Sequence, residues 1–431
     1  MKQAVKRRGA CVKKYTELNF DEALKNWLSY VGRLDPEIVN LDGALSRILA
    51  ADLYSDIDVS PFDNSAMDGF ALRADDIASA TIGSPVDLEV SVCIAAGDYW
   101  EGKLQPGQIA RIMTGAPVPA GADTVVKVED TTTLSCSSDS GQVTVRFSAP
   151  SPQGNNIRLK GEEVAAAERV LKQGEYLNPA AIGLLAATGN VQVPVYRQPT
   201  VGIISTGEEL VPATELPLQG KIRNTNSPSL AAQAGAAGAQ VRQYENIPDT
   251  LKDTIAVFKK AAAECDLIIS SGGVSVGDFD FVEKAVRQIG ELHFASVQMR
   301  PGKPQTTGLI EDTPFFGLPG NPASAYLGFE LFVRPAILKM SGHTRLKRPV
   351  QTAKLEHDIN KRLGLRYFMR GIVEPIDGQA VVRLSGDQSS ALLTSLHRAN
   401  CLLVLPEEET QLKAGSSITC IRLDIDERVE I

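Results

Sequence analysis

The chain has 431 residues, more than one hydrophobic core usually holds, so its length predicts two to four domains. Hydrophobic residues (43%) and charged residues (22%) occur in the proportions of a soluble globular protein, and the formal net charge is -8. This acidic balance argues against nucleic acid as the main partner, because a phosphate-binding surface needs a basic stripe.

The N-terminal part is expected to form a tail followed by two helices. Residues 1–14 contain six lysines and arginines with no apolar segment behind them, so we interpret them as a disordered basic tail and not as a secretory signal. Apolar residues at helical spacing predict a helix over 19–30 with Asn19 as its cap. A second helix is expected over 41–51.

Short alternating segments dominate the next part of the chain. Clusters of Gly, Pro, Asp and Ser separate expected strands at 86–92, 109–113, 124–128 and 142–148. They predict a β-rich insertion. A loop at 157–163 and a helix at 178–187 are expected to follow.

Strands and helices alternate from about residue 200. The expected strands are 200–205, 239–244, 266–270, 292–297 and 314–317, and the helices between them are 227–237, 249–263 and 279–289. This alternation predicts a mostly parallel, doubly wound sheet that binds ligands at the carboxyl ends of its strands. Five more strands, at 351–355, 368–373, 380–384, 401–405 and 417–423, predict a small C-terminal β domain.

Cysteine spacing and hydropathy suggest the compartment. The six cysteines are scattered without a CxxC pair, so the sequence predicts neither a zinc cluster nor a disulfide framework. Reduced thiols in a cytoplasmic protein are expected. No apolar run approaches the roughly 18 residues that a membrane-spanning helix needs, so we expect no membrane contact.

The segment 61–71, PFDNSAMDGFA, combines two carboxylates, an amide and a hydroxyl with several apolar residues. One interpretation is a short helix over 66–71 that Asn64 and Ser65 cap. The other is a loop that presents polar groups to a metal ion or a polar cofactor. Similar glycine-punctuated polar loops follow apolar strands further along the chain, which favours the site.

Two of those loops follow strands of the predicted sheet. The segment 205–209, STGEE, presents hydroxyls and carboxylates, although the pattern is also typical of a helix cap. The segment 270–280 exposes glycine N–H groups before a helix N-terminus and therefore suits an oxyanion. Asp278 and Asp280 would repel that anion unless a cation such as Mg²⁺ intervenes, which favours a metal-bridged phosphate.

Three more segments extend the predicted site. Arg300 and Lys303 place two cations on a turn, which alone would be typical of a solvated surface. Asn321, followed by proline, predicts a helix start with free N–H groups at the same sheet edge. The segment 111–119 is the weakest, because Thr114 also fits an ordinary turn. These patterns indicate a phosphate-containing ligand, a divalent cation and nearby carboxylates.

Seven motifs in chain order support a family resemblance. They are DNSAMDGFA (63–71), RIMTGAPVP (111–119), NIRLKGEE (156–163), STGEEL (205–210), SSGGVSVGDFDF (270–281), RPGKP (300–304) and GLPGNPASA (317–325). Together they resemble the MoeA family of molybdopterin molybdenumtransferases, which includes the E domains of gephyrin and of its plant counterpart. The resemblance runs from about Tyr15 to the C-terminus.

The resemblance implies an α/β multidomain fold. Its parts would be a discontinuous elongated domain I (15–55 and 151–195), a β-rich inserted domain II (56–150), a molybdopterin-binding-type doubly wound α/β domain III (196–341) and a C-terminal β domain IV (342–431). It also implies a homodimer with a composite active site, in which domain III of one subunit meets the first two domains of the other. Other proteins of molybdenum cofactor biosynthesis are implied as partners.

The implied reaction inserts molybdate into adenylylated molybdopterin, with Mg²⁺-dependent release of AMP. Carried over motif by motif, the catalytic residues would be Asp68, Thr114 and Glu163, and the metal ligands would be Glu209 and Asp280. The substrate-binding residues would be Asp63, Asn64, Ser65, Ser271, Gly272, Gly273, Ser275, Arg300, Lys303, Pro319, Gly320 and Asn321.

Three positions depart from the family pattern. Arg300 stands where Lys is frequent, Glu163 where Asp is common, and Asn224 where Asp is more familiar. Arg and Lys are not equivalent at a tight anion site. Two alternatives remain beside the transferase: a gephyrin-like scaffold without catalysis, and a paralogue that inserts tungstate, an ion of nearly the same size as molybdate.

Overall fold

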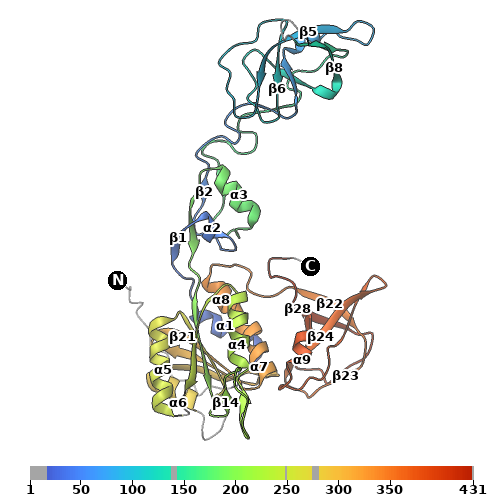
Figure 1. The fold of residues 1–431 in the computed structure, drawn as a ribbon. Helices are drawn as coiled ribbons and strands as arrows, with labels where there is room; N and C mark the ends of the chain where they lie inside the picture. Colours follow the sequence, from blue (N-terminus) through green and yellow to red (C-terminus); the bar gives the residue numbers. More distant parts are fainter. Residues whose placement is uncertain (1–16, 137–142, 248–249, 274–280, 430–431) are drawn as a thin grey trace. The chain divides into compact units, whose positions relative to one another are not determined.

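The computed structural model describes residues 17–136, 143–247, 250–273 and 281–429 (Figure 1). The chain divides into two compact units. Unit 1 contains the residues up to Glu37, Ser46–Ala50 and Val195–Ile431, and unit 2 contains Ile38–Leu45 and Ala51–Pro194. The finer division into four domains stays a prediction.

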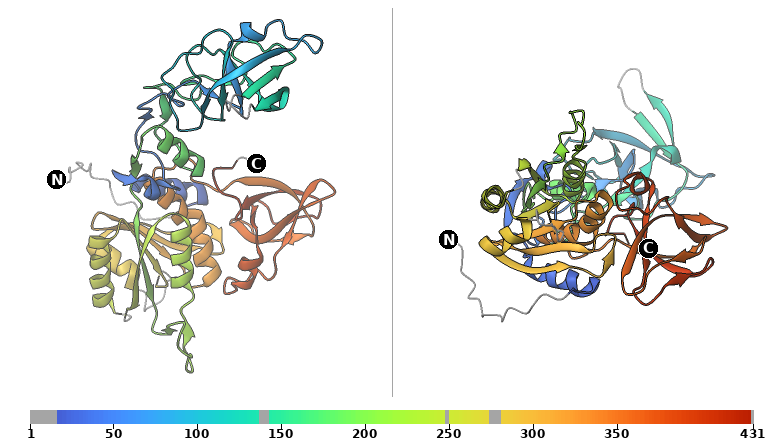
Figure 2. Two further views of the ribbon diagram at one scale, coloured as in Figure 1. Left: turned by 45° about the horizontal axis from the view of Figure 1, so that its top comes forward. Right: turned by 90° about the horizontal axis from the view of Figure 1, so that it is seen from below.

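A six-stranded sheet forms the centre of the α/β part of unit 1 (Figures 1 and 2). Its order is β16 (Gln240–Ile247), β13 (Thr200–Thr206), β17 (Leu267–Ser271), β21 (Thr313–Leu318), β20 (Pro304–Ile310) and β18 (Gly290–Ser296). The first four strands are parallel, whereas β20 pairs antiparallel with both neighbours. The predicted mostly parallel sheet is confirmed, except that the sequence analysis expected no strand at β20.

Helices cover both faces of this sheet because successive strand residues point to opposite sides. Ile203 and Phe316 share one core with the first group of helices, and Ile204 and Phe315 share another with the second group. The first group is α1 (Phe20–Tyr30), α4 (Asn226–Ala236), α7 (Pro322–Gly328) and α8 (Arg334–Met340). The second group is α5 (Leu251–Glu264) and α6 (Phe281–Ile289).

Helix α1 begins as predicted, since the Asn19 side chain accepts a hydrogen bond from the Glu22 N–H (2.9 Å). The resemblance placed this segment in an elongated domain. In the structure, Phe20 and Trp27 instead lie in the core of the α/β part, and the Trp27 indole donates to the carbonyl of Phe332 (3.0 Å). The first helix therefore belongs to unit 1.

The C-terminal part of unit 1 is a closed barrel. Its strands are β22 (Val350–Leu355), β24 (Arg366–Ile376), β25 (Gln379–Leu384), β26 (Cys401–Leu405) and β28 (Ser417–Arg422). They follow the order β24-β25-β22-β28-β26, and β24 also pairs with β26, which closes the barrel. The short strand β19 (Met299–Arg300) pairs with β24, and helix α9 (Thr394–Arg398) lies between β25 and β26 in the chain. The predicted C-terminal β domain is confirmed.

Unit 2 contains a second six-stranded sheet. Its order is β7 (Thr124–Lys127), β4 (Gly69–Leu72), β6 (Gln108–Ile112), β5 (Val86–Ile94), β9 (Val143–Phe147) and β8 (Thr131–Cys136). Two small sheets pair β10 (Ile157–Arg158) with β3 (Asn64–Ser65), and β11 (Arg169–Leu171) with β2 (Leu53–Tyr54). The helix predicted over 178–187 is confirmed as α3 (Pro179–Ala187), and the Asn178 side chain caps it.

Two expected helices are wrong. The helix predicted over 41–51 is only α2 (Leu41–Ala44), because the backbone turns extended at Leu45 and reaches a φ of 63° at Ser46. The possible helix over 66–71 is strand β4. The first residue of this strand, Gly69, has to be a glycine, since a Cβ there would lie 2.2 Å from the carbonyl oxygen of Val126. Within the described ranges, no helix is long and apolar enough to cross a membrane.

Candidate functional site

Three motif segments of unit 2 come together around β3. Asn64 and Ser65 pair with β10, and Asn64 also forms a bridge with Pro117. The Ser65 N–H donates to the carbonyl of Ala116 (3.0 Å), and the Gly115 N–H donates to the carbonyl of Ser65 (2.8 Å). Segments that lie about ninety residues apart in the sequence thus form one local structure.

Asp68 and Thr114 are the central pair of this structure. Asp68 directly precedes β4 and Thr114 is the second residue after β6, and these strands are antiparallel neighbours. One oxygen of the Asp68 carboxylate, Oδ1, accepts from both the N–H and the hydroxyl of Thr114, each at 2.7 Å. Those two hydrogen bonds and the nearby positive charge of Arg111 hold the pKa of Asp68 below its usual value. Asp68 is therefore an exposed, oriented carboxylate.

Arg111 belongs to this site but received no role from the sequence analysis. Its guanidinium donates to the carbonyl of Gly69 (2.9 Å) and lies over the Phe70 ring, 5.1 Å from the centroid. It thus holds the backbone directly after Asp68. The sequence signal that could have identified Arg111 as a site residue is its position in strand β6, three residues before Thr114.

The other predicted residues of unit 2 play different parts. Asn64 and Ser65 are buried, and the Ser65 hydroxyl donates to the carbonyl of Met67 (2.6 Å), so they shape the loop. The Asp63 carboxylate accepts from the Lys160 N–H (2.7 Å), which ties two motifs together. Glu163 is exposed on the same unit.

The predicted residues of unit 1 gather at the carboxyl edge of the parallel strands. The Asn226 amide donates to the Ser271 hydroxyl (2.7 Å) and to the carbonyl of Gly320 (2.8 Å). Gly272 has a φ of 89° and donates its N–H to the carbonyl of Leu318 (3.1 Å). Three segments therefore meet here through Asn226, which the sequence analysis did not assign.

The side chain of Asn224 also serves this edge. Its amide oxygen accepts from the Ser227 N–H (3.0 Å) in the first turn of α4. A carboxylate oxygen accepts the same hydrogen bond, so the cap survives the departure from the family's Asp.

The capping interpretation of the segment 205–209 is wrong. Thr206 ends β13, and the chain continues to the short strand β14 (Leu210–Val211), which pairs with β15 (Ile222–Arg223). The Glu209 side chain folds back over Gly207. A Cβ on that glycine would lie only 2.6 Å from Glu209 Oε2. Glu209 is exposed beside the strand edge.

The helix start at Asn321 differs from the prediction in two respects. Pro322 occupies the first turn of α7 as expected, but Asn321 makes no side-chain hydrogen bond to that helix. The N–H of Ala323 is not free, since it donates to the carbonyl of Ser390 (2.9 Å). A loop of the C-terminal barrel therefore takes part of the expected anion-binding helix end.

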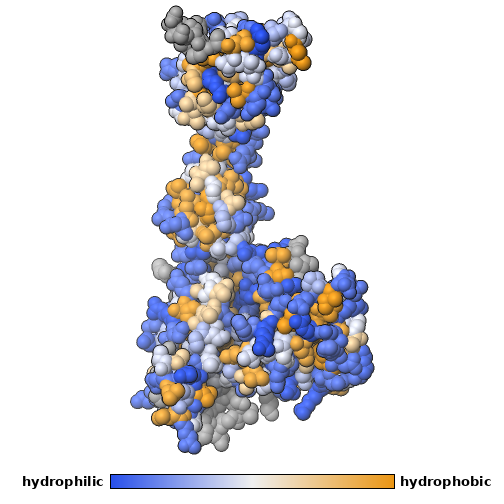
Figure 3. Space-filling view, turned by 45° about the vertical axis from the view of Figure 1, so that its right-hand side comes forward, coloured by the Kyte–Doolittle hydropathy of each residue, from blue (hydrophilic) through white to orange (hydrophobic). Residues whose placement is uncertain are grey.

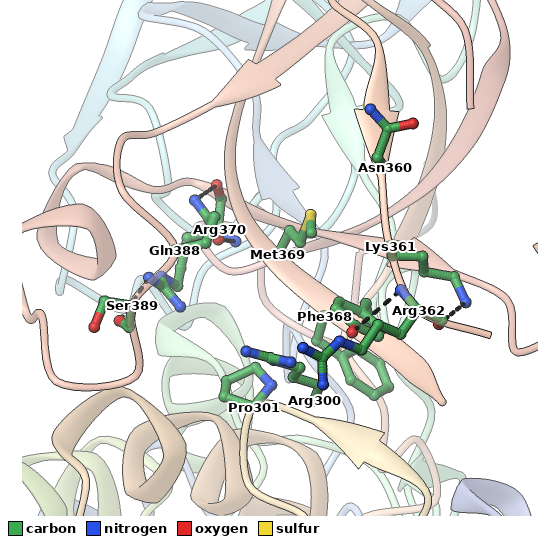
Figure 4. Close-up of a pocket in the computed structure, with 11 residues that line it drawn as sticks. Arg300, Pro301, Asn360, Lys361, Arg362, Phe368, Met369, Arg370, Gln388 and Ser389 are labelled. Atoms are coloured by element: carbon green, nitrogen blue, oxygen red, sulfur yellow. Dashed lines mark hydrogen bonds between the residues drawn. The ribbon is translucent and has the colours of Figure 1, made fainter. Parts of the chain in front are cut away.

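A basic cavity of about 510 Å³ lies between the Arg300 turn and the barrel (Figure 4). No Asp or Glu is among its lining residues, which are Arg300, Pro301, Asn360, Lys361, Arg362, Tyr367, Phe368, Met369, Arg370, Gln388 and Ser389. Lys303 is not in this set, and its ammonium pairs with the Glu17 carboxylate (2.8 Å). The cavity suits an oxyanion.

Arg370 is the buried cation of this cavity, with a relative exposure of 0%. Its guanidinium donates to the Ser395 hydroxyl (3.1 Å) and to the carbonyls of Asp387 (2.8 Å) and Ser389 (3.0 Å). Within the described chain, its Nη1 has no hydrogen-bond partner and none of its hydrogen bonds goes to a carboxylate. Burial lowers the pKa of this guanidinium, which nevertheless stays charged at neutral pH.

Two predicted site residues, Ser275 and Asp280, lie outside the described residues. In the ranges that the structure does describe, no group of three or more His, Cys, Asp or Glu side chains is arranged to hold a metal ion. Of the predicted metal ligands, only Glu209 is therefore described.

Known families account for nearly the whole chain. The model of a probable molybdopterin binding domain matches residues 202–339, which defines the class of the α/β part. The MoeA N-terminal region (domain I and II) matches residues 18–189, and the MoeA C-terminal region (domain IV) matches residues 352–423.

Curated relatives match over their full length. The molybdopterin molybdenumtransferase of Staphylococcus aureus (strain MSSA476) is 35% identical over 416 residues, which cover 96% of this chain and 98% of the relative. That of Staphylococcus epidermidis (strain ATCC 12228 / FDA PCI 1200) is 36% identical over 411 residues, covering 95% and 96%. The molybdopterin biosynthesis MoeA protein from Pyrococcus horikoshii OT3 matches in structure with a TM-score of 0.77 and 30% identity, covering 94% of this chain and 99% of that one. The chain belongs to the MoeA family.

Proposed function

We propose that this protein is a molybdopterin molybdenumtransferase, which inserts molybdate into adenylylated molybdopterin and releases AMP during molybdenum cofactor biosynthesis. The full-length relatives support this reaction. The observation that carries it is the basic cavity around Arg370. A buried guanidinium that is hydrogen-bonded to no carboxylate is costly, and an anion bound beside it would offset that cost.

Arg370 and Arg300 bind an oxyanion in this cavity, either molybdate or a phosphate of the pterin substrate. Arg300 lies in β19, and its guanidinium is 5.7 Å from the centroid of the Tyr367 ring. A planar guanidinium offers paired donors to two oxygens of one anion. Ser271, Gly272, Gly273, Pro319, Gly320 and Asn321, with Lys303, Ser275 and the Asn226 amide, hold the remainder of the substrate at the sheet edge.

Asp68 supplies a carboxylate for the reaction. Its pKa is held below the usual value, so it is ionised at neutral pH and accepts a proton or orients an attacking oxygen. Thr114 keeps the carboxylate in one orientation through two hydrogen bonds. Glu163, whose backbone N–H donates to the carbonyl of Val59 (3.2 Å), contributes a second carboxylate from the same unit. Asp63, Asn64 and Ser65 maintain the loop between them.

Magnesium is proposed as the ion that compensates the pyrophosphate. Mg²⁺ usually keeps several waters and binds one or two carboxylates together with substrate phosphates. The exposed Glu209 carboxylate beside the strand edge fits that kind of site, and Asp280 would be the second ligand. When bound, the ion neutralises charge that develops on the phosphate oxygens.

We propose a homodimer whose active site combines residues of both subunits. Unit 2 supports it with an apolar surface: where Figure 1 places α2, α3 and β2, Figure 3 shows clustered apolar side chains on the visible face. Ile38, Tyr54 and Val191 of this unit are each more than half exposed. A surface of this kind is typical of an interface between copies.

The dimer is tested with Gly183→Glu in α3. Gly183 is exposed, and a Cβ there would meet no atom within 4 Å, so the folded subunit accepts the change. We expect light scattering to show monomers for this variant and dimers for the wild type. Gly235→Glu in α4 is the matched control, because that exposed helical glycine also has open space. Equal masses for wild type and Gly183→Glu would contradict an interface at α3.

The reaction is tested by incubating the purified protein with adenylylated molybdopterin, Mg²⁺ and molybdate. We expect AMP release that depends on all three. A protein that releases no AMP with molybdate or with tungstate would not be a transferase, and the gephyrin-like scaffold would then be the better interpretation. Release with tungstate alone would identify the tungstate paralogue. We place the reaction in the cytoplasm, with other proteins of molybdenum cofactor biosynthesis as partners.

A further inference from the structure

Strand β24 loses a regular partner where it passes the basic cavity. On one side, Arg370 pairs with Leu402 of β26. On the other side, the register with β25 begins at Gly371, which faces Leu384, the last residue of β25. The Ser385 N–H still reaches the carbonyl of Arg370 (3.0 Å), but the chain then turns away into a loop.

The Gln388 side chain occupies the place that β25 leaves. Its Oε1 accepts from the backbone N–H of Arg370 (2.8 Å), and its Nε2 donates to the backbone carbonyl of Arg370 (3.1 Å). The same Nε2 also donates to the carbonyl of Gly386 (2.8 Å). One amide group therefore replaces a residue of the strand, using its donor and its acceptor together.

Arg370 returns the contact from its own side chain. The guanidinium donates to the carbonyls of Asp387 and Ser389, the two neighbours of Gln388 in the chain. The Gln388 side chain is thus hydrogen-bonded to the backbone of Arg370, and the Arg370 side chain is hydrogen-bonded to the backbone on both sides of Gln388. We call these contacts the Arg370–Gln388 clasp.

The clasp sets the wall of the cavity. Arg370, Gln388 and Ser389 all line it, and Figure 4 shows them on one side, across from Arg300. The next residue, Ser390, accepts the N–H of Ala323 at the start of α7. The clasp therefore connects the buried cation with the helix that follows Asn321.

We propose that Gln388 is a positioning residue that fixes the Arg370 guanidinium for oxyanion binding. The inference rests on the proposed function of the cavity. The guanidinium is hydrogen-bonded only to neutral acceptors, and the Asp387 carboxylate acts on it electrostatically without a hydrogen bond, so its direction depends on where the loop carbonyls lie. Gln388 sets that direction by locking the loop to the backbone of Arg370 itself.

The test is Gln388→Leu, which keeps the side-chain size and removes all three hydrogen bonds. Molybdate alone is the binding probe, measured by calorimetry, and AMP release is measured against molybdate concentration. We expect the Kd and the KM for molybdate to rise roughly tenfold, because a buried network loses its partners, while kcat at saturation changes less than about twofold. Gln379→Leu is the matched control, since Gln379 is an exposed residue at the start of β25.

If Gln388→Leu does not fold, Gln388→Glu tests the same side chain, and Ser395→Ala is a companion variant that changes a direct partner of the guanidinium. Ser395→Ala removes the hydroxyl that accepts from Arg370 Nε, at a buried position on another segment. It should raise the KM for molybdate about threefold with kcat unchanged. Gln388→Glu should weaken molybdate binding further, because a carboxylate cannot donate to the carbonyls of Arg370 and Gly386 and adds a negative charge to the wall of the cavity.

The outcomes separate the two proposals. A wild-type protein that neither binds molybdate nor releases AMP overturns the proposed function. A wild type that binds and turns over, together with a folded Gln388→Leu variant of unchanged Kd and KM, overturns the positioning role alone. A fall in kcat at saturation with unchanged KM also overturns it.

Discussion

The acidic pair of unit 2 and the basic cavity of unit 1 hold their charges in opposite surroundings. Asp68 is exposed, and Thr114 orients it. Arg370 is fully buried, and the loop around Gln388 orients it. Yet the hydrogen bonds to both charged groups come from neutral partners, so neither group is hydrogen-bonded to an opposite charge.

A third charged cluster shows the contrast. Arg334 pairs with Glu427 (2.7 Å) and Arg348 pairs with Glu330 (3.1 Å), and all four side chains are largely buried. Buried charges that pair with each other compensate one another and leave little of their charge for a substrate. The kind of partner therefore distinguishes the candidate site from structural ion pairs better than burial does.

The largest effect is expected from removing the acidic group. Asp68→Ala should abolish AMP release, and Asp68→Asn, which keeps an acceptor for Thr114, should reduce it about a hundredfold or more. Circular dichroism should show an intact fold, because the residue is exposed. An Asp68→Asn variant with wild-type activity would mean that the charge has no role.

The basic cavity gives the next largest effect. Arg370→Lys keeps the charge but cannot donate to Ser395 and to two carbonyls at once. We expect a KM for molybdate that is roughly thirtyfold higher. Lys361→Arg is a useful comparison, because the Lys361 ammonium already bonds backbone carbonyls of the barrel. If both variants behaved like wild type, the cavity would not be the oxyanion site.

A smaller effect is expected where only the orienting hydroxyl is lost. Thr114→Val keeps the backbone N–H bond to Asp68 and removes the hydroxyl bond, so AMP release should fall about tenfold. The pKa of Asp68 should rise toward its usual value of 3.8. Because the folded pKa is lowered, the stabilisation that comes from the ionised Asp68 carboxylate is fully present above pH 3.8. It is lost as the pH falls through the folded pKa. The acid limb of the pH profile should therefore shift upward in this variant.

The smallest effect concerns the acid sensitivity of unit 1. Burial, with Arg334 and Arg428 nearby, lowers the pKa of His343 from 6.5 to about 4, although Asp426 opposes this. The unfolded chain therefore binds the proton first, and stability falls as the pH drops from 6.5 toward 4. Between pH 7 and pH 5 the free energy of unfolding should fall by about 2 kcal/mol from this residue. Urea unfolding of His343→Gln should show a correspondingly weaker pH dependence, and an identical one would remove His343 from the account.

Periodicity was sufficient to predict much of the fold. Alternation predicted the parallel strands, and Asn19 and Asn178 marked two helix starts correctly. Helical spacing failed to predict residues 41–51, where the helix ends at Ala44 and Leu49 forms a β-bridge with Val195. It also failed at Gly69, whose glycine serves a close strand contact and not a turn.

The site was only partly predictable for a related reason. Motifs mark residues that stand in distinctive local runs, such as Asp68 and Ser271. Arg370 lies in a strand and Gln388 in a loop, and neither stands in a distinctive motif. Their role arises from a mutual contact that no local sequence pattern predicts. Asn226 escaped assignment in the same way, since its two partners come from distant segments.

The closure of the C-terminal barrel has a consequence for the lifetime of the cavity wall. At Arg370, strand β24 pairs with β26 along one edge and is hydrogen-bonded to the Gln388 side chain along the other, and regular pairing with β25 begins at Gly371. An amide in such a strand exchanges with solvent only when a whole cooperative segment opens. The backbone beneath Arg370 should thus be among the slowest-exchanging parts of the chain, so that the anion-binding geometry persists from one turnover to the next.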